Sequence, residues 1–121
     1  MNEIIDNIED INSFRKQLSS TEKSLKAMLI KDSLDPEDIA LYSKFAENGP
    51  PILQYNFGEL YFLGEKVQQD YQEACSWFQR AAEQEDPLAQ SFLASMYFDG
   101  QGVEVDEKQA LFWFQKAADQ G

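Results

Sequence analysis

Hydrophobic and polar positions repeat with a fixed period along the second part of the chain. The octet WFQRAAEQ at residues 77–84 returns 36 residues later as WFQKAADQ at residues 113–120. Without any gap, 14 of the 35 positions in residues 51–85 are identical to their counterparts in residues 87–121. A period of about 20 to 50 residues is typical of solenoids built from stacked units. The sequence therefore predicts two repeats, over residues 51–86 and 87–121.

Each repeat has the pattern of two helices connected by a short joint. We expect first helices over residues 52–63 and 88–98, and second helices over residues 71–84 and 107–120. In each joint a glycine ends the first helix (Gly64 and Gly100) and a valine is expected to point inward (Val67 and Val103). The spacing of a capping box then starts the second helix (Asp70–Glu73 and Asp106–Gln109). The expected core consists of small residues for close helix packing and of aromatic residues, namely Ala81, Ala82, Ala117, Ala118, Trp77, Trp113, Tyr61 and Tyr97.

The first 50 residues carry weaker patterns. Residues 36–50 align with the second helix of a repeat and predict a degenerate half repeat, with Asp35 as N-cap, Pro36 at the first helical position and Gly49 as the C-terminal cap. Residues 1–35 predict an N-terminal helical cap or extension. Within it, residues 3–31 have helical apolar spacing, which fits either one long helix or two helices broken near Ser19.

The second repeat also resembles a known family. It carries the Gly-x-Gly-Val joint, the capping aspartate and the Trp-x-x-x-Ala-Ala spacing at Gln90, Leu93, Ala94, Tyr97, Gly100, Gly102, Val103, Asp106, Ala110, Trp113, Phe114, Ala117, Ala118 and Gly121. This pattern is similar to the Sel-one-like repeat (SLR), a relative of the tetratricopeptide repeat. The resemblance implies an all-α fold, a right-handed α/α superhelical solenoid, which the N-terminal helical extension predicted from residues 1–35 would precede. It also implies an adaptor, scaffold or inhibitor rather than a catalyst.

Three positions depart from the family pattern. Lys66 replaces the second glycine of the joint, so we expect the two joints to differ. Glu85 replaces a C-terminal cap glycine, so we expect the second helix of the first repeat to end less tightly. Ala94 replaces a glycine at a close helix approach, which is a small change.

The composition limits the chemistry. The chain has no histidine, which removes the usual general base and the usual transition-metal ligand. The single cysteine, Cys75, aligns with Leu111 and is expected to be a small buried apolar residue. The acidic start of residues 99–102 lacks the rest of a calcium loop. We therefore expect no enzyme activity, no metal and no cofactor.

Charge and hydropathy limit the partners. The net charge of −12 divides into −4 for residues 1–50 (10 acidic, 6 basic) and −8 for residues 51–121 (12 acidic, 4 basic). Such a charge repels nucleic acid and anionic membrane surfaces, and it fits either a solvated surface or a basic protein partner. The acidic N-terminus is unlike a secretory signal and no apolar run is long enough to span a membrane, which predicts a cytoplasmic location.

The expected binding surface is the inner face of the solenoid, which the first helices of stacked pairs line. Its exposed stripe is predicted to contain Tyr55, Glu59, Phe62, Ser91, Ser95 and Phe98. Phe62 and Phe98 fit two roles, half-buried core residues or apolar anchors for a bound segment. Phe112 aligns with the polar Ser76, so it is expected to lie open and to support partner binding or self-association through the C-terminal end.

Two functions from different classes fit these patterns. The first is a non-catalytic module that binds a protein or peptide on the inner face. The alternative is an inhibitor of a basic toxin or enzyme, such as a bacterial immunity protein or antitoxin.

Overall fold

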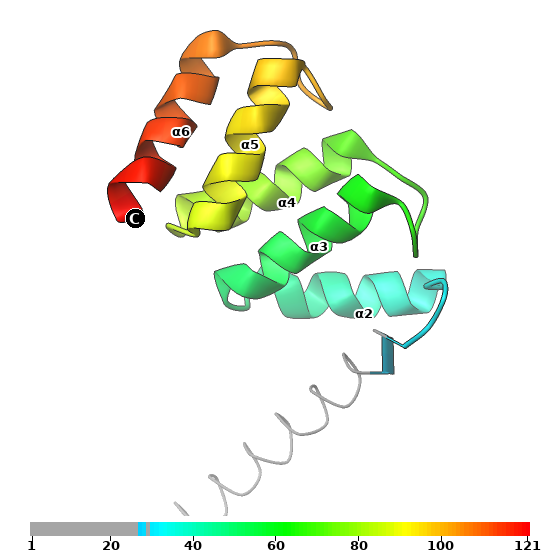
Figure 1. Cartoon of the computed structure of the whole chain (residues 1–121). Coiled ribbons are helices and arrows are strands. Elements are labelled where there is room, and N and C mark those ends of the chain that lie inside the picture. Colours follow the sequence, from blue (N-terminus) through cyan, green and yellow to red (C-terminus); the bar gives the residue numbers. More distant parts are fainter. Residues whose placement is uncertain (1–26, 29) are drawn as a thin grey trace, which may run out of the picture. The chain divides into compact units, whose positions relative to one another are not determined.

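The computed structural model describes residues 27, 28 and 30–121, and Figure 1 shows their arrangement. The described residues contain no strand and form five helices: α2 (Pro36–Glu47), α3 (Pro51–Leu63), α4 (Tyr71–Glu83), α5 (Pro87–Asp99) and α6 (Glu107–Gln120). The predicted all-α class is confirmed. The choice between one and two helices in residues 3–31 concerns residues that, except for the last few, lie outside the described part of the chain.

The helices of residues 32–121 are stacked in chain order. Within each repeat the first helix packs on the second, α3 on α4 and α5 on α6 (Figure 1). Successive repeats are joined by the packing of α5 on α4, and α2 packs on α3 in the same manner. The most extensive contacts are between neighbours in the chain, which is the arrangement of an α/α solenoid.

Aspartate side chains start the second helices, but in a different way from the predicted capping boxes. The Asp70 carboxylate accepts hydrogen bonds from the backbone of Gln72 and Glu73, both at 3.1 Å. The reciprocal bond from Asp70 N–H to Glu73 does not form, because this N–H donates to the carbonyl of Tyr61 at 3.0 Å. Asp106 behaves in the same way 36 residues later. A complete capping box instead occurs at Asp35 and Asp38, before α2.

The joints between first and second helices differ, as the Lys66 substitution predicts. Gly64 and Gly100 both end their helices in the left-handed conformation, with φ of 69° and 71°. Gly102 is also left-handed, whereas Lys66 at the equivalent position is not. A Cβ atom on Gly102 would lie 2.4 Å from the carbonyl oxygen of Tyr71, so only glycine fits there.

Two predictions about helix ends are wrong. Glu85 is left-handed at φ 69°, and it closes α4 tightly: Glu85 N–H donates to Ala82 O and Asp86 N–H to Ala81 O, the two bonds of a Schellman motif. Gly49 is not the left-handed cap of α2, whose C-cap is Asn48.

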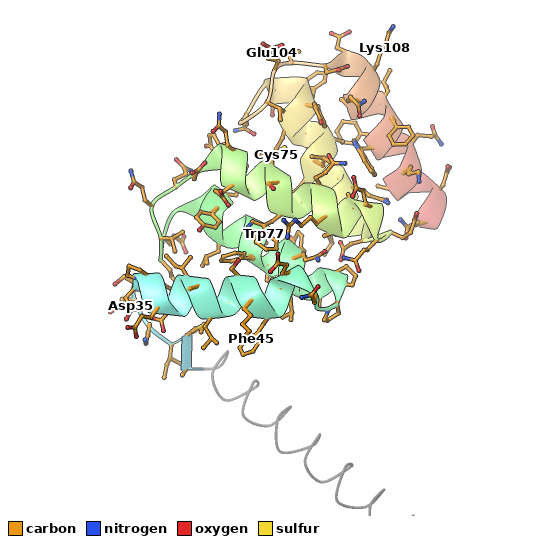
Figure 2. The ribbon with its side chains drawn as sticks, turned by 180° about the vertical axis from the view of Figure 1, so that it is seen from behind. Asp35, Phe45, Cys75, Trp77, Glu104 and Lys108 are labelled. Atoms are coloured by element: carbon orange, nitrogen blue, oxygen red, sulfur yellow. The ribbon has the colours of Figure 1, made fainter. Side chains whose placement is uncertain are left out.

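Three of the four predicted core residues of the first repeat are buried, whereas Tyr61, like its counterpart Tyr97, is only partly buried against the core. Ala81, Ala82 and Trp77 of α4 are almost fully enclosed, and Figure 2 shows Trp77 and Cys75 on this helix among its neighbours. Cys75 is a free and buried thiol, as predicted. In the second repeat Trp113 is buried as Trp77 is, which confirms its expected direction towards the preceding helices.

The two alanines at the end of α6 correct the predicted core. Ala117 is only partly buried and Ala118 is exposed. Their counterparts in α4 are covered because α5 packs on that helix, whereas among the described residues no later helix packs on α6. These alanine positions are therefore buried only where the first helix of a following repeat packs on them.

Two buried glutamines connect the repeats to one another. Gln90 Nε2 donates to the carbonyl of Ala82 at 3.1 Å, and Gln90 Oε1 accepts from Gln120 Nε2 at 2.7 Å. Gln54 makes the equivalent two bonds 36 residues earlier. Each glutamine therefore links the end of one second helix to the end of the next, through the first helix that lies between them.

Candidate protein-binding surfaces

A groove of about 380 Å³ lies between the two first helices. It is lined by Phe62 of α3, by residues of α5 and by one residue of the following joint, namely Ser91, Phe92, Ser95, Met96, Asp99 and Gln101. Three of the residues singled out in the sequence, Phe62, Ser91 and Ser95, are thus brought together. All three are partly exposed.

Phe62 combines the two roles that the sequence left open. Its ring centroid lies 5.3 Å from that of Tyr71, 5.6 Å from that of Phe92 and 6.5 Å from that of Phe78. It is therefore anchored in the aromatic core by one side while another side lines the groove. A ring held in this way loses little conformational freedom when a ligand covers it.

Tyr55 is not part of the exposed stripe, which corrects the prediction. It is buried, with its ring 5.7 Å from Phe78 and 5.8 Å from Phe92. The Phe92 side chain of α5 covers Tyr55, and a helical stripe drawn on α3 alone does not reveal this contact. Its hydroxyl donates to Glu59 at 2.8 Å. Burial and this bond raise the pKa of Tyr55 to about 12.

Four groove residues were missed in the sequence: Phe92, Met96, Asp99 and Gln101. The predicted stripe on α5 ran through Ser91, Ser95 and Phe98, whereas the groove runs one residue further around the helix. Phe98 is 60% exposed and does not line it. The available signal was the adjacent pair Ser91–Phe92, since a large ring beside small residues is typical of a pocket wall.

The surroundings of the groove are acidic. Asp99 lines it directly, and no lysine or arginine does. Residues 81–107, which include all of α5, contain seven acidic and no basic side chains. The groove therefore combines apolar walls with a negative rim.

The outer face of α6 is a second apolar surface. Leu111 is 69% exposed and Phe112 is 50% exposed, and Phe114 is also open. Phe112 is open as expected, although Leu111 is more so. Leu111 and Phe114 occupy the positions that Cys75 and Phe78 hold in α4, where α5 covers them.

The described residues do not form a metal or membrane site. They contain no group of three or more histidine, cysteine or acidic residues that could hold a metal ion. Burial raises the pKa of the Cys75 thiol, which disfavours the reactive thiolate. None of the described helices has both the length and the apolar character that a membrane span requires.

Stacked helix pairs with a 36-residue period, a left-handed glycine after each first helix and a groove between first helices define a tetratricopeptide-like α/α repeat protein. The model of the Sel1 repeat family matches residues 51–86 and 87–121. The chain belongs to the Sel1 repeat family, whose members generally act as protein–protein interaction modules.

Solved structures that resemble the chain include the following three. A Sel1 repeat protein from Oxalobacter formigenes is 32% identical, with a TM-score of 0.71, over 84% of this chain and 79% of that protein. A protective antigen of uropathogenic Escherichia coli strains with an SLR fold is 39% identical, with a TM-score of 0.65, over 69% of this chain and only 18% of the antigen. Cysteine rich protein B of Helicobacter pylori shares the fold at 21% identity and a TM-score of 0.67, over 90% of this chain and 89% of that one. Comparison with curated protein sequences gives no match.

Proposed function

We propose that the chain is a non-catalytic interaction module that binds a segment of another protein in the groove between α3 and α5. The observation that carries this proposal is the groove itself, with the partly exposed Phe62 and Phe92 as walls and Asp99 at its edge. Apolar walls with a few polar groups are typical of sites that capture one or two side chains of a peptide.

The acidic rim favours a basic segment. Because Asp99 lines the groove and no lysine or arginine does, a lysine or arginine next to the apolar anchor of the ligand is attracted there. The partner class is therefore a protein or peptide with an apolar side chain flanked by basic residues.

A selection of random peptides on the full chain tests this proposal. We expect selected peptides to contain an apolar residue beside basic ones, and to shift the amide resonances of Ser91 and Phe92. Ser95→Arg places a large cation in the groove and should weaken binding at least about tenfold, by steric exclusion and by repulsion of the basic ligand.

Gln109→Arg is the matched control, since it adds the same charge at an exposed position of α6 outside the groove. It should change the affinity by less than about twofold. Equal binding to the Ser95→Arg variant and to the unchanged protein would show that the groove is not the site.

A second candidate function is inhibition of a basic toxin or enzyme, as an immunity protein or antitoxin does. It is favoured by the charge of residues 32–121, which carry 17 acidic and 5 basic side chains. A strongly basic protein encoded beside this chain is the candidate target. Its association rate should fall at least about tenfold between low and high salt, and its activity should be lost on binding. A rate independent of salt contradicts this function.

Self-association through α6 is a further part of the proposal, supported by the open side chains of Leu111, Phe112 and Phe114. Phe112→Ser introduces the residue found at position 76, so the helical content should persist while association weakens. Analytical ultracentrifugation and circular dichroism measure the two effects. Unfolding of this variant, with no assembly of the unchanged protein, would assign Phe112 to the core instead.

A further inference from the structure

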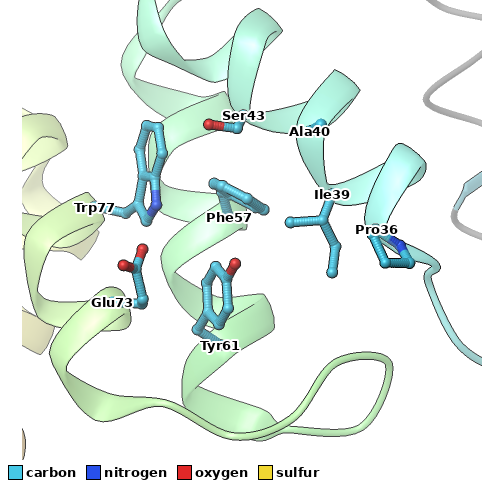
Figure 3. Close-up of a pocket in the computed structure, with 8 residues that line it drawn as sticks. All are labelled: Pro36, Ile39, Ala40, Ser43, Phe57, Tyr61, Glu73 and Trp77. Carbon is cyan, nitrogen blue, oxygen red and sulfur yellow. The ribbon is translucent and has the colours of Figure 1, made fainter.

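A second pocket of about 340 Å³ lies between α2, α3 and α4 (Figure 3). It is separate from the groove, because Phe57 and Tyr61 line it from α3 whereas Phe62, on another side of that helix, lines the groove. The remaining lining residues come from α2 and α4, namely Pro36, Ile39, Ala40, Ser43, Glu73 and Trp77.

Three aromatic rings form one wall of this pocket. The ring centroid of Phe57 lies 4.8 Å from that of Trp77 and 5.2 Å from that of Tyr61, with interplanar angles of 64° and 60°. Phe57 and Trp77 are almost fully buried, and Tyr42 stacks on Phe57, so the partly exposed Tyr61 is the ring most open to the pocket. Aromatic faces attract cations, and the attraction is strongest for the indole of tryptophan.

Glu73 brings a carboxylate to the same pocket. Figure 3 shows this carboxylate between the rings of Trp77 and Tyr61. Burial raises the pKa of Tyr61, and the negative charge of Glu73 raises it further, which places the carboxylate close to the phenol.

The Glu73 carboxylate lies in the first turn of α4, where a negative charge suits the helix N-terminus, but it does not cap the helix. The capping function expected for it is absent, because Asp70 N–H donates to Tyr61. Within the described part of the chain, Glu73 accepts no hydrogen bond through its side chain and forms no ion pair. Among the described residues, this carboxylate beside the aromatic walls has no paired cation.

The second repeat shows that the stacking of repeats does not require this arrangement. At the equivalent positions Glu73 is replaced by Gln109 and Phe57 by Leu93, while the tyrosine and the tryptophan are retained as Tyr97 and Trp113. The carboxylate and one ring of the pocket therefore belong to the first repeat alone.

We propose that this pocket binds the guanidinium group of an arginine side chain presented by a basic partner protein. A guanidinium is planar, stacks on aromatic faces and pairs with a carboxylate through two hydrogen bonds, so it can use the partly exposed Tyr61 ring together with Glu73. The chain already contains one such contact on the same indole, since the Arg80 Cζ atom lies 4.5 Å from the ring centroid of Trp77. The lining residues include no lysine or arginine that would repel the ligand.

The pocket extends the proposed function to a second, independent contact on a different face. Titration of the full chain with the peptide acetyl-Gly-Arg-Gly-amide tests it by nuclear magnetic resonance. The chain has two indole N–H signals, from Trp77 and Trp113, so the second serves as an internal reference. We expect the Trp77 signal to shift with saturation and the Trp113 signal to stay in place.

Two comparisons test the role of the charge. The same peptide with citrulline in place of arginine keeps the shape but loses the charge, and it should give no saturable shift. Glu73→Gln should weaken arginine binding about tenfold, as expected for loss of a charge-assisted hydrogen bond. This variant should fold normally, because Glu73 is exposed and glutamine occupies the equivalent position of α6.

Glu104→Gln is the matched control, since it removes one acidic charge in the loop before α6 (Figure 2). It should leave the affinity unchanged within about twofold. Equal binding of the citrulline peptide, or an equal loss in the Glu104→Gln variant, would overturn the proposal. Shifts confined to Ser91 and Phe92 would overturn it as well, and would leave the groove as the only site for the basic segment.

Discussion

Replacement of Gln90 by methionine should destabilise the whole repeat array, although methionine has nearly the same length and flexibility. Gln90 is fully buried, and its side chain bonds to Ala82 O and to Gln120 Nε2. Gln90→Met removes both bonds without leaving a large cavity. The effect therefore measures the hydrogen bonds rather than the packing.

The expected loss follows from these two bonds. Each contributes a net stabilisation of about 0.5–1.5 kcal/mol, so the pair contributes about 2 kcal/mol. The carbonyl of Ala82 keeps one donor, the N–H of Glu85, and Gln120 is exposed to water, so neither group is left buried without a partner. For a domain of this size the loss corresponds to a decrease in Tm of about 10 °C.

Urea denaturation followed by circular dichroism measures this loss. Gln79→Met is the control, because Gln79 bonds to Glu83 on the exposed face of α4 and its loss should cost less than about 0.5 kcal/mol. Gln54→Met should reproduce the loss of Gln90→Met, since Gln54 makes the equivalent bonds. If Gln90→Met is no more destabilising than Gln79→Met, the glutamine bonds do not hold the repeats together.

Three smaller effects are also expected. Glu85→Gly should raise the free energy of unfolding by about 0.5 kcal/mol. The left-handed φ destabilises a non-glycine residue by more than the added flexibility of glycine destabilises the variant. A decrease in urea resistance would instead show that the ion pair of Glu85 with Lys116 stabilises the fold by more than the left-handed φ destabilises it. Burial raises the pKa of Tyr42 to about 12, so the native state keeps the proton that the unfolded state loses near pH 10. The contribution of Tyr42 to stability should therefore be constant below pH 10 and fall from pH 10 to 12, and Tyr42→Phe should reduce the fall in stability over this range in urea titrations at several pH values. Cys75 should react with a thiol reagent slowly in the native protein and rapidly in urea, and fast native labelling would contradict its burial.

The helices and the core were predictable because local and periodic signals determine them. Proline at helix starts, aspartate at N-caps and glycine after the first helices act within a few residues of the chain. The burial of Trp113 could be predicted from that of its counterpart Trp77, because equivalent residues of two repeats face equivalent neighbours wherever those neighbours are present.

The incorrect predictions concern residues whose contacts come from a segment that is distant in the sequence. Tyr55 was placed on the surface because the helical stripe of α3 does not include Phe92, which arrives from α5. Glu73 was assigned to a capping box because the sequence does not show that Tyr61 would take the Asp70 N–H. Glu85 shows a limit of a different kind, since a Schellman motif formed although its left-handed residue is not glycine.

The open face of α6 makes the array suitable for extension by design. The carbonyl of Ala118 accepts the N–H of Gly121, as that of Ala82 accepts the N–H of Glu85, and Ala82 receives Gln90 in addition. A copy of residues 87–121 fused after Gly121 would place its own glutamine beside Ala118 and its first helix over Leu111 and Phe114. We therefore expect that longer scaffolds can be built from this chain by adding units of one sequence.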